Sequence, residues 1–357
     1  MALIIAEAGV NHNGNEDLAI QLIDAAHAAG ADIVKFQTFR ASKIVTKTAR
    51  MAQYQRVNTG RSESQYEMLS RLELSVDSHH RLLAHSKKLG IGFLSTAFDS
   101  DSLNFLVEDI GLKKLKIPSG EITNAPLVLE HARTGCELII STGMASLREI
   151  EDILGVIAFG YLADLHEEPS IEAFRNAYYS DQGKSVLKDK VTILHCTTEY
   201  PAPFEDINLF AMDTLSAAFG LRVGFSDHSE GIAVAIAAVA RGAEVIEKHF
   251  TLDKTMEGPD HKASLNPEEL EAMVHGIRSI ELSFGDGIKG PRPSEFKNLN
   301  MARKSIVAGR NISEGEIIEY KDVEIKRPGG GMSPFSLWKI IGRPAKFSFK
   351  AGDLIVD

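Results

Sequence analysis

Short apolar runs rich in β-branched residues recur along the first two thirds of the chain, and a segment with helical periodicity follows each of them. The eight runs cover residues 3–7, 32–37, 92–95, 113–117, 137–141, 191–195, 222–225 and 244–247. Continuous apolar runs, rather than alternating ones, are typical of strands buried on both faces in a parallel sheet. In the first intervening segment, Leu18, Leu22, Ile23 and Ala26 form one helical stripe. Eight strand and helix units in series predict a closed (β/α)8 barrel that ends with a helix over residues 267–284.

Three other segments depart from this alternation of apolar runs and helical segments. Residues 41–65 are polar and basic and residues 161–190 are charged, so we expect both to be surface elaborations of the barrel. Glycine and proline punctuate residues 285–300, as in a linker. Short strands and turns follow, with strands expected at 303–308, 316–317 and 322–327. We therefore predict an α/β protein with a catalytic barrel over 1–285, a linker over 286–301 and a small C-terminal domain over 302–357. Because this domain is marginal in size, we expect it to depend on the barrel for stability.

Composition narrows the class of protein further. The chain has 44% hydrophobic residues and a net charge of −10 that is spread along its length, which argues against nucleic acid or an anionic membrane as a partner. The only cysteines, Cys136 and Cys196, have no C-x-x-C spacing, so neither a disulfide framework nor a thiolate zinc site is indicated. Without a signal peptide pattern or an apolar run of ~20 residues, the sequence predicts a cytoplasmic protein.

Polar residues gather where the predicted strands end, which is where barrel enzymes place their active sites. These residues are Glu7, Asn11, His12, Lys35, Gln37, Ser95, Thr96, Lys116, Ser119, Glu121, Ser141, Thr142, His195, Thr198, Tyr200, Ser226, His228, Glu247, Lys248 and His249. Serine and threonine at such positions could also be helix N-caps, but capping does not explain the whole set.

His228 and His249 follow two neighbouring predicted strands, the seventh and eighth. Adjacent parallel strands lie ~4.8 Å apart, so both imidazoles can reach one ion. Imidazole is the commonest protein ligand of a catalytic divalent metal, and two histidines without a third ligand leave positions open for water and substrate. The pair therefore predicts a metal site at the barrel mouth.

Lys35 and Lys116 end the second and fourth strands, where a buried ammonium needs a partner or a lowered pKa. A bound phosphate would meet that need, with hydroxyls of Thr96, Ser119, Ser141 and Ser226 as further donors. A Schiff base on one of the lysines is the alternative, although a metal and an imine are usually alternative ways to activate a carbonyl.

Six motifs resemble those of the bacterial sialic acid synthase family, whose members carry an antifreeze-like (SAF) C-terminal domain. They are AEAGVNHNG at 6–14, VKFQT at 34–38, KIPSGE at 116–121, STGM at 141–144, FSDH at 225–228 and EKHF at 247–250. The resemblance covers essentially the whole chain. It implies condensation of phosphoenolpyruvate with an N-acetylmannosamine-type aldose and water, giving a nine-carbon 2-keto acid and phosphate.

The resemblance also assigns roles to individual residues. His228 and His249 would hold a divalent ion, Mn²⁺ first, with Mg²⁺ or Co²⁺ as alternatives, and would be catalytic together with Lys116 and Glu121, the latter as a proton carrier. The residues expected to bind phosphoenolpyruvate are Lys35, Thr96, Lys116, Ser119, Ser141 and Ser226. Those expected to face the sugar are Glu7, Gln37, Asn58, Tyr200 and Asp260.

The C-terminal segment 326–331 (KRPGGG) is similar to the family segment whose arginine reaches the sugar of the neighbouring subunit. Arg327 would then complete the site of a partner in a domain-exchanged homodimer. Thr198 and Phe36 depart from the pattern of some sialic acid synthases and point to the legionaminic acid synthase branch. The acceptor therefore stays open between N-acetylmannosamine and 2,4-diacetamido-2,4,6-trideoxymannose. A pyruvate aldolase or lyase, and a sugar-binding barrel without catalysis, are the more distant hypotheses.

Overall fold

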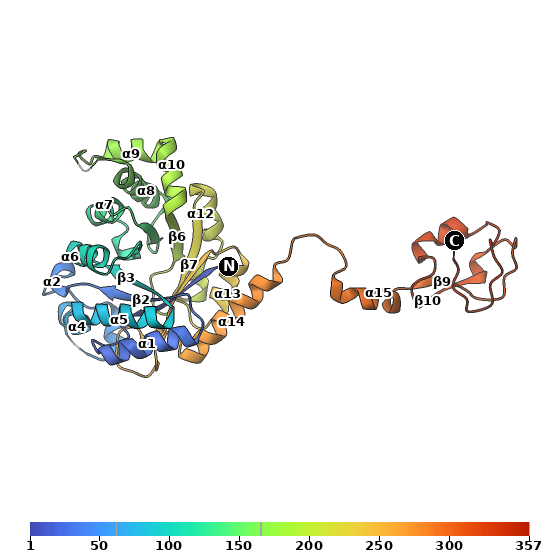
Figure 1. Ribbon diagram of the computed structural model, residues 1–357, viewed down its shortest axis with the longest axis horizontal. Helices are drawn as coiled ribbons and strands as arrows, with labels where there is room; N and C mark the ends of the chain where they lie inside the picture. Colours follow the sequence, from blue (N-terminus) through green and yellow to red (C-terminus); the bar gives the residue numbers. More distant parts are fainter. Residues whose placement is uncertain (62, 165, 357) are drawn as a thin grey trace. The chain divides into compact units, whose positions relative to one another are not determined.

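The computed structural model describes residues 1–61, 63–164 and 166–356, and its first eight strands close into a parallel barrel (Figure 1). The strands are β1 Leu3–Gly9, β2 Ile33–Thr38, β3 Gly92–Ala97, β4 Lys114–Ile117, β5 Glu137–Ser141, β6 Val191–Cys196, β7 Arg222–Asp227 and β8 Val245–His249. Each strand pairs with the next, and β8 returns to β1 with Glu7 opposite His249. The (β/α)8 prediction is confirmed.

Most strands run one or two residues beyond their predicted C-terminal ends. Several of the extra residues are polar, for example Thr96, Asp227 and His249, so they fall outside an apolar run although their backbones continue the ladder. Thr96, Ser226 and His249, three of the expected site residues, lie in these extensions.

Helices form the outer layer of the barrel (Figure 1). The principal ones are α1 Glu16–Ala28, α5 Val76–Leu89, α7 Ala125–Arg133, α8 Leu147–Leu162, α12 Ala211–Phe219, α13 Ala233–Ala240 and α14 Pro267–Ser283, and α6 Ser100–Asn104 continues into the π-helical turn η1 Phe105–Asp109. Their sequences explain where they begin: the Asn15 side chain caps α1, and Asn266 caps α14 in a capping box with Glu269. In the described part of the chain, no helix is both long and apolar enough to cross a membrane.

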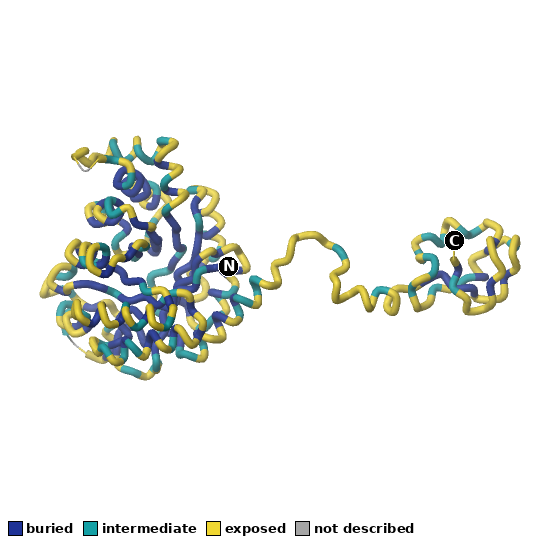
Figure 2. Tube along the Cα trace, in the orientation of Figure 1, coloured by how far each residue is buried: buried dark blue, intermediate teal, exposed yellow. Residues whose placement is uncertain are grey.

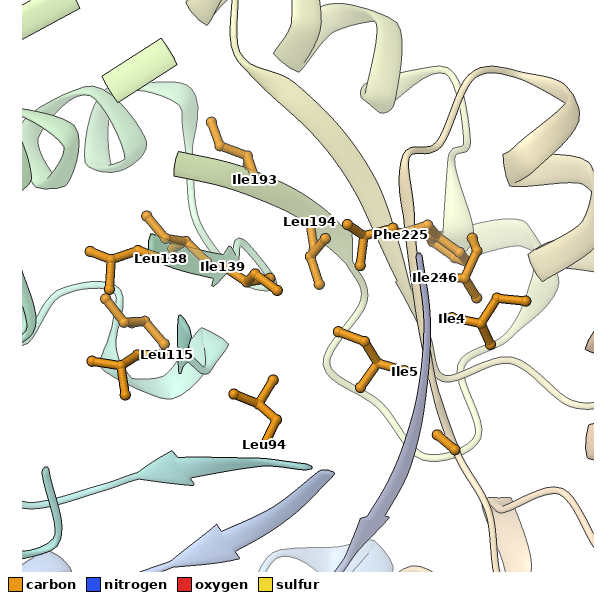
Figure 3. Close-up of a cluster of buried hydrophobic side chains, with 14 of the residues drawn as sticks. Ile4, Ile5, Leu94, Leu115, Leu138, Ile139, Ile193, Leu194, Phe225 and Ile246 are labelled. Carbon is orange, nitrogen blue, oxygen red and sulfur yellow. The ribbon is translucent and has the colours of Figure 1, made fainter. Parts of the chain in front are cut away.

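The interior below the mouth is apolar. Figure 3 shows Ile5, Leu94 and Leu194 facing the space enclosed by the strands, each at most 1% exposed. Ile5 and Leu94 lie two residues before Glu7 and Thr96, on the same strand face. Apolar side chains therefore fill the barrel interior below the mouth, and the polar side chains form a separate layer at the mouth.

The two predicted surface elaborations differ. The later one contains α9 Ile171–Tyr179 and α10 Asp181–Lys190, and α9 buries none of its residues, as Figure 2 shows. The earlier one contains α2 Ala41–Ile44 and α3 Gln53–Thr59 and leads into α4 Gln65–Leu72. Here the surface prediction was wrong in part, because Met51 is buried in a small core with Val10, Phe39 and the α4 residues Met68 and Leu72. We call residues 41–72 the cap.

The chain divides at Phe284 into two compact units. The second unit begins with η4 Pro293–Glu295 and α15 Phe296–Ala302, so a helix occupies the end of the expected linker. Its strands β9 Ser305–Ala308 and β10 Val323–Lys326 pair in antiparallel fashion, and η5 Tyr320–Asp322, η6 Pro334–Ser336 and α16 Leu337–Ile340 complete it. Ile306, Ile312, Ile318 and Phe349 belong to its own apolar core.

Candidate active site

A cavity of about 240 Å³ lies at the barrel mouth, where the extended strand ends and the cap meet. Its lining comprises Glu7, Val10, Lys35, Gln37, Gln55, Met68, Leu69, Leu72, Thr96, Phe98, Lys116, Pro118, Ser119, Gly120, Ser141, Thr198, Tyr200, Ser226, His228, Glu247, His249, Pro259 and Asp260. A larger hollow of about 660 Å³ lies along α8 and α9. Its charged side chains, such as Arg148 and Asp152, are exposed, whereas the mouth cavity gathers buried titratable groups, so we place the site at the mouth.

Two lysines and two glutamates form the charged centre of this cavity. The Lys35 Nζ lies 3.0 Å from Glu7 Oε2 and 3.1 Å from Glu247 Oε2. The Lys116 Nζ lies 3.4 Å from the other oxygen of Glu247. Each of these four residues is at most 5% exposed. Glu247 thus bridges two buried ammonium groups, and the lysines have carboxylate partners in the protein itself.

Burial and neighbouring charges shift these groups in different directions. Burial would raise the pKa of Glu247, but Lys116 and Lys35 hold the pKa of this carboxyl well below its usual range. Burial raises the pKa of Glu7 to about 7, because its one lysine partner is shared with Glu247. Burial also lowers the pKa of Lys116, against the opposing effect of Glu247, whereas Glu247 and Glu7 outweigh burial and raise the pKa of Lys35. Glu247 is therefore the fixed anion of the site, and Glu7 is its proton-holding carboxyl.

Four hydroxyl groups surround this centre. Lys35 donates to Thr96 Oγ1 at 3.2 Å and Lys116 donates to Ser141 Oγ at 2.7 Å. Ser226 Oγ donates to Glu247 Oε1 at 2.9 Å, and Ser119 Oγ accepts from the Gly143 N–H at 3.0 Å. All four hydroxyls expected from the sequence line the cavity together with both lysines. Such a set of cations and donors suits a phosphoryl group.

His228 and His249 face the same cavity, with ring centroids 5.7 Å apart. The Nδ1 of His228 lies 2.7 Å from the Thr197 carbonyl oxygen, to which it donates. In the neutral ring, that contact places the proton on Nδ1 and leaves Nε2 with a lone pair for another ligand. Although burial acts in the opposite direction, Cys196 and the Thr197 carbonyl raise the pKa of His228, so a cation competes with a proton for this ring. Nδ1 of His249 is buried and has no hydrogen-bond partner in the protein. Burial, together with His228 and Lys35, holds the pKa of His249 well below its ordinary value, so this imidazole is neutral.

These features fit a divalent cation bound by two imidazoles. His249 is neutral, and the neutral form of His228 presents its Nε2 lone pair, as a metal requires of its ligands. Among the described residues, no group of three or more His, Cys, Asp or Glu side chains is arranged to hold a metal alone. An ion bound by His228 and His249 would therefore keep coordination positions for water or substrate.

Further residues expected at the sugar side also reach the cavity. Gln37 lines it and donates to Glu7 Oε1 at 3.3 Å. The Tyr200 ring lies 4.1 Å from the His228 ring and 5.7 Å from the His249 ring, centroid to centroid. Asp260 lies in the loop after β8 and is 8% exposed. The structure thus gathers Glu7, Gln37, Tyr200 and Asp260 beside the histidines.

Four other predicted positions lie elsewhere. Glu121 is absent from the cavity lining, because Asn124 at the start of α7 donates to its carboxylate at 2.7 Å. Asn58 also does not line the cavity and instead donates to the Pro259 carbonyl at 2.7 Å, which ties the cap to the loop that carries Asp260. Phe36 is fully buried between His12 and Phe93, on the opposite strand face from Lys35. Arg327 belongs to the second unit, where it donates to the Ala302 carbonyl at 3.0 Å.

The sequence analysis placed Glu247 among the polar strand ends and in the EKHF motif but gave it no role in the site. The signal was present, because Glu247 stands two positions before His249 on one strand and must share its inward face. It also missed the cap residues Gln55, Met68 and Leu72, which line the cavity. Met68 and Leu72 stand four residues apart, a spacing that fits the buried face of an ordinary helix.

Asp260 gives a pH-dependent prediction for the metal-free protein. Burial raises the pKa of this carboxyl from 3.8 to about 6. Between these values the folded state binds more protons than the unfolded state, so this residue makes stability fall as pH rises. We expect the free energy of unfolding of the wild type to drop by about 3 kcal/mol relative to Asp260→Asn between pH 3.5 and 6.5. Urea unfolding of both proteins in EDTA across this range measures the difference, and parallel curves would contradict the burial of an ionising carboxyl here.

The fold and the site together define a barrel enzyme with a buried cluster of lysines and glutamates beside a histidine pair, joined to a small C-terminal β domain. The chain belongs to the NeuB family, whose model matches residues 22–289, and a SAF domain model matches residues 303–357. The family expected from the motifs is confirmed, and the chain is a synthase of the sialic acid type.

Relatives with known names support this membership. The chain is 47% identical over 99% of its length to the N,N'-diacetyllegionaminic acid synthase of Campylobacter jejuni, of which it covers 98%. It is 44% identical, again over 99% of its length, to the enzyme of the same name from Legionella pneumophila, covering 93% of it. Among solved structures, the N-acetylneuraminic acid synthetase of Leptospira borgpetersenii in complex with citrate is 33% identical, with a TM-score of 0.65 over 83% of this chain and 90% of that one.

Proposed function

We propose that this enzyme condenses phosphoenolpyruvate with 2,4-diacetamido-2,4,6-trideoxymannose and water, forming N,N'-diacetyllegionaminate and phosphate. One observation carries the proposal: Lys35 and Lys116 meet at Glu247 within the cavity that also holds His228 and His249. A phosphoryl-bearing substrate and an aldehyde can thus lie side by side. In the reaction, C3 of phosphoenolpyruvate bonds to the aldehyde carbon, water adds to C2, and the C2–O bond to phosphate breaks.

Lys35, Lys116, Thr96, Ser119, Ser141 and Ser226 are the proposed phosphoenolpyruvate ligands. The ammonium groups carry the charge of the phosphate and the hydroxyls donate to its oxygens. Burial makes these interactions stronger than they would be in water. As phosphate leaves, Lys116 stays beside the developing anion, because Ser141 and Glu247 hold its Nζ in place.

His228 and His249 are the proposed ligands of a divalent cation, Mn²⁺ first, with Mg²⁺ and Co²⁺ as alternatives. When bound, such an ion supplies Lewis acidity to a carbonyl oxygen. Glu7 and Gln37 then orient the sugar from the neighbouring strands β1 and β2. Glu7 can hold or release a proton near neutral pH at the carboxylate beside Lys35, since its pKa is raised to about 7 by burial. Asp260 and Tyr200 line the same cavity beside the histidines.

The choice of acceptor is supported by the names of the two relatives at 47% and 44% identity. Thr198 also lines the cavity, and its Oγ1 is buried without a hydrogen-bond partner in the protein, so a sugar amide or hydroxyl can pair with it. Phe36 carries no part of this argument, because it lies outside the cavity.

Phosphate release from phosphoenolpyruvate tests this function directly. Purified enzyme with Mn²⁺ is offered 2,4-diacetamido-2,4,6-trideoxymannose and N-acetylmannosamine in separate assays. We expect a kcat/KM at least tenfold higher for the diacetamido sugar. A preference for N-acetylmannosamine would overturn the acceptor and leave the sialic acid type of chemistry intact.

A Schiff-base aldolase has one observation in its favour, since burial lowers the pKa of Lys116 and so favours its neutral amine. The salt bridge to Glu247 opposes this effect. Borohydride reduction in the presence of pyruvate separates the two chemistries, because only an imine leaves a covalent adduct on Lys116 or Lys35. We expect no adduct.

We further propose that two chains form a homodimer in which Arg327 of one chain completes the sugar site of the other. This arginine follows from the resemblance, and its guanidinium is exposed in the second unit with a single hydrogen bond to the backbone there. Arg327→Ala is expected to raise KM for the sugar about 30-fold, roughly the 2 kcal/mol of a lost charged hydrogen bond, with little change in KM for phosphoenolpyruvate. The neighbouring Lys326→Ala, which removes a cation paired with Glu324, is the control.

Mixing two impaired variants tests the shared site, with the sugar held well below its KM so that the raised KM of Arg327→Ala limits the turnover of that variant. Arg327→Ala and His249→Ala are unfolded and refolded together, so that mixed dimers combine an intact barrel from one chain with an intact C-terminal domain from the other. Recovery of about a quarter of the wild-type activity is expected for random pairing. Half of the dimers are then mixed, and each mixed dimer has one complete site of its two. Absence of recovery would mean that each chain completes its own site.

A further inference from the structure

A buried polar cluster of Asp227, Ser229 and Lys248 lies directly behind the histidine pair and has no part in the chemistry proposed above. Asp227 and Lys248 pair with one another in the register of β7 and β8. Each immediately precedes one of the two histidines, His228 or His249. Because side chains alternate along a strand, the histidines face the cavity while Asp227 and Lys248 face the helical layer.

We propose that Asp227, Ser229 and Lys248 act as a clamp that fixes the separation of the His228 and His249 imidazoles for a divalent cation. These three are positioning residues, which touch neither substrate nor ion. The inference rests on the metal site of the proposed function and goes beyond it, because it names what holds that site in shape.

The hydrogen bonds of the clamp converge on the backbone around His228. Lys248 Nζ lies 2.8 Å from Asp227 Oδ2 and donates to the Ser229 carbonyl at 2.6 Å. Asp227 Oδ1 accepts from the Ser229 N–H at 2.8 Å and from its hydroxyl at 2.6 Å. The residues on both sides of His228 are thereby attached to the side chain that precedes His249.

His228 is also held from the strand on its other side. Its Nδ1 donates to the Thr197 carbonyl, just after β6, and the Ala202 N–H donates to the His228 carbonyl at 2.8 Å. With the clamp on the β8 side, neither the position nor the ring orientation of His228 can change independently of its neighbours.

Stability alone does not explain why the clamp contains a buried ion pair. The side chains of Lys248 and Asp227 are at most 1% exposed, and removing two charges from water costs about as much as their attraction returns. Apolar residues of similar size would stabilise the two strands as well or better. A buried ion pair does fix one geometry, and groups that orient metal ligands typically contribute roughly 10- to 100-fold to metal affinity.

Metal binding to the folded protein tests the clamp without any turnover. Mn²⁺ is titrated into wild type, Lys248→Met, Asp227→Asn and Ser229→Ala by calorimetry, with the free ion followed by electron paramagnetic resonance, at a temperature where circular dichroism shows each protein folded. We expect Mn²⁺ to bind roughly 10- to 100-fold more weakly to the first two variants. Ser229→Ala leaves no buried charge unpaired, so its affinity for Mn²⁺ should fall severalfold.

Two controls separate positioning from stability. Lys114→Met removes the Lys114–Glu137 pair, which joins the register partners of β4 and β5 at 2.8 Å far from the histidines, and it should bind Mn²⁺ like the wild type. The double variant Asp227→Asn/Lys248→Met has no unpaired charge, so it should regain thermal stability over the single variants and still bind Mn²⁺ weakly.

The outcomes are distinct. Wild-type affinity in the three single variants, or recovery of affinity together with stability in the double variant, overturns the clamp and leaves the metal site standing. If wild-type protein binds no Mn²⁺, Mg²⁺ or Co²⁺, the metal site fails and the clamp fails with it.

Discussion

Replacing His249 with alanine is expected to lower turnover at least 1000-fold while the barrel stays folded. The imidazole contributes to the polar layer at the mouth, and its Nδ1 has no hydrogen bond in the protein that the substitution could break. The lost imidazole leaves one protein ligand for the cation, which is too few to hold it at working concentrations. Phosphate release with saturating Mn²⁺ measures turnover, and thermal unfolding followed by circular dichroism measures the fold.

His131 supplies the control for this variant. It is also buried, on α7, and its Nε2 lacks a hydrogen-bond partner in the protein, but it does not line the cavity. His131→Ala should cost stability and leave kcat within about threefold of the wild type. Full turnover by His249→Ala with stoichiometric Mn²⁺ would remove this histidine from the metal site.

Glu247→Gln is expected to destabilise the ligand-free enzyme by about 3–5 kcal/mol, because it removes the carboxylate that pairs with Lys116 and leaves Lys35 with Glu7 alone. A phosphate dianion can replace the lost charge. Inorganic phosphate or phosphoenolpyruvate should therefore raise the melting temperature of the variant more than that of the wild type. Differential scanning calorimetry over a series of phosphate concentrations measures both the loss of stability and the rise of the melting temperature with phosphate.

Glu137→Gln provides a comparison from the barrel wall. Glu137 pairs with Lys114 at 2.8 Å, and its side chain is 49% exposed, so its loss should cost less than about 1 kcal/mol and bring no extra response to phosphate. An equal phosphate response in wild type and Glu247→Gln would show that the anion does not bind between Lys35 and Lys116.

The barrel could be predicted from the sequence because its strands are continuous apolar runs with helical segments between them. The same signal placed the strand ends one or two residues short, since polar residues such as Thr96 and His249 continue the ladder without adding to an apolar pattern. Type and order of the elements followed from hydrophobicity, and their ends depended on hydrogen bonds that a pattern of side chains does not reveal.

The site was predictable where chemistry and strand order agree. Lys35, Lys116, His228 and His249 are unusual residues at strand ends, and the closed barrel brings them together. Glu121 stands in the same motif as Ser119, but a local hydrogen bond from Asn124 decides where its carboxylate points. The buried lysines predicted an anion, and the chain supplies one itself in Glu247, which only the packed structure reveals.

The cap divides two tasks between different parts of the chain. The groups proposed for phosphate and metal stand on strands of the closed barrel, whereas Met68, Leu69 and Leu72 reach the same cavity from α4, with Gln55 contributed by α3. A cavity of about 240 Å³ is smaller than the roughly 300–1,000 Å³ typical of small-molecule sites, so the cap residues stand close to whatever the strand residues bind. Substitutions in these short helices can therefore redesign which aldose is admitted while the reactive groups keep their geometry, a separation that lets new acceptors evolve on an unaltered catalytic frame.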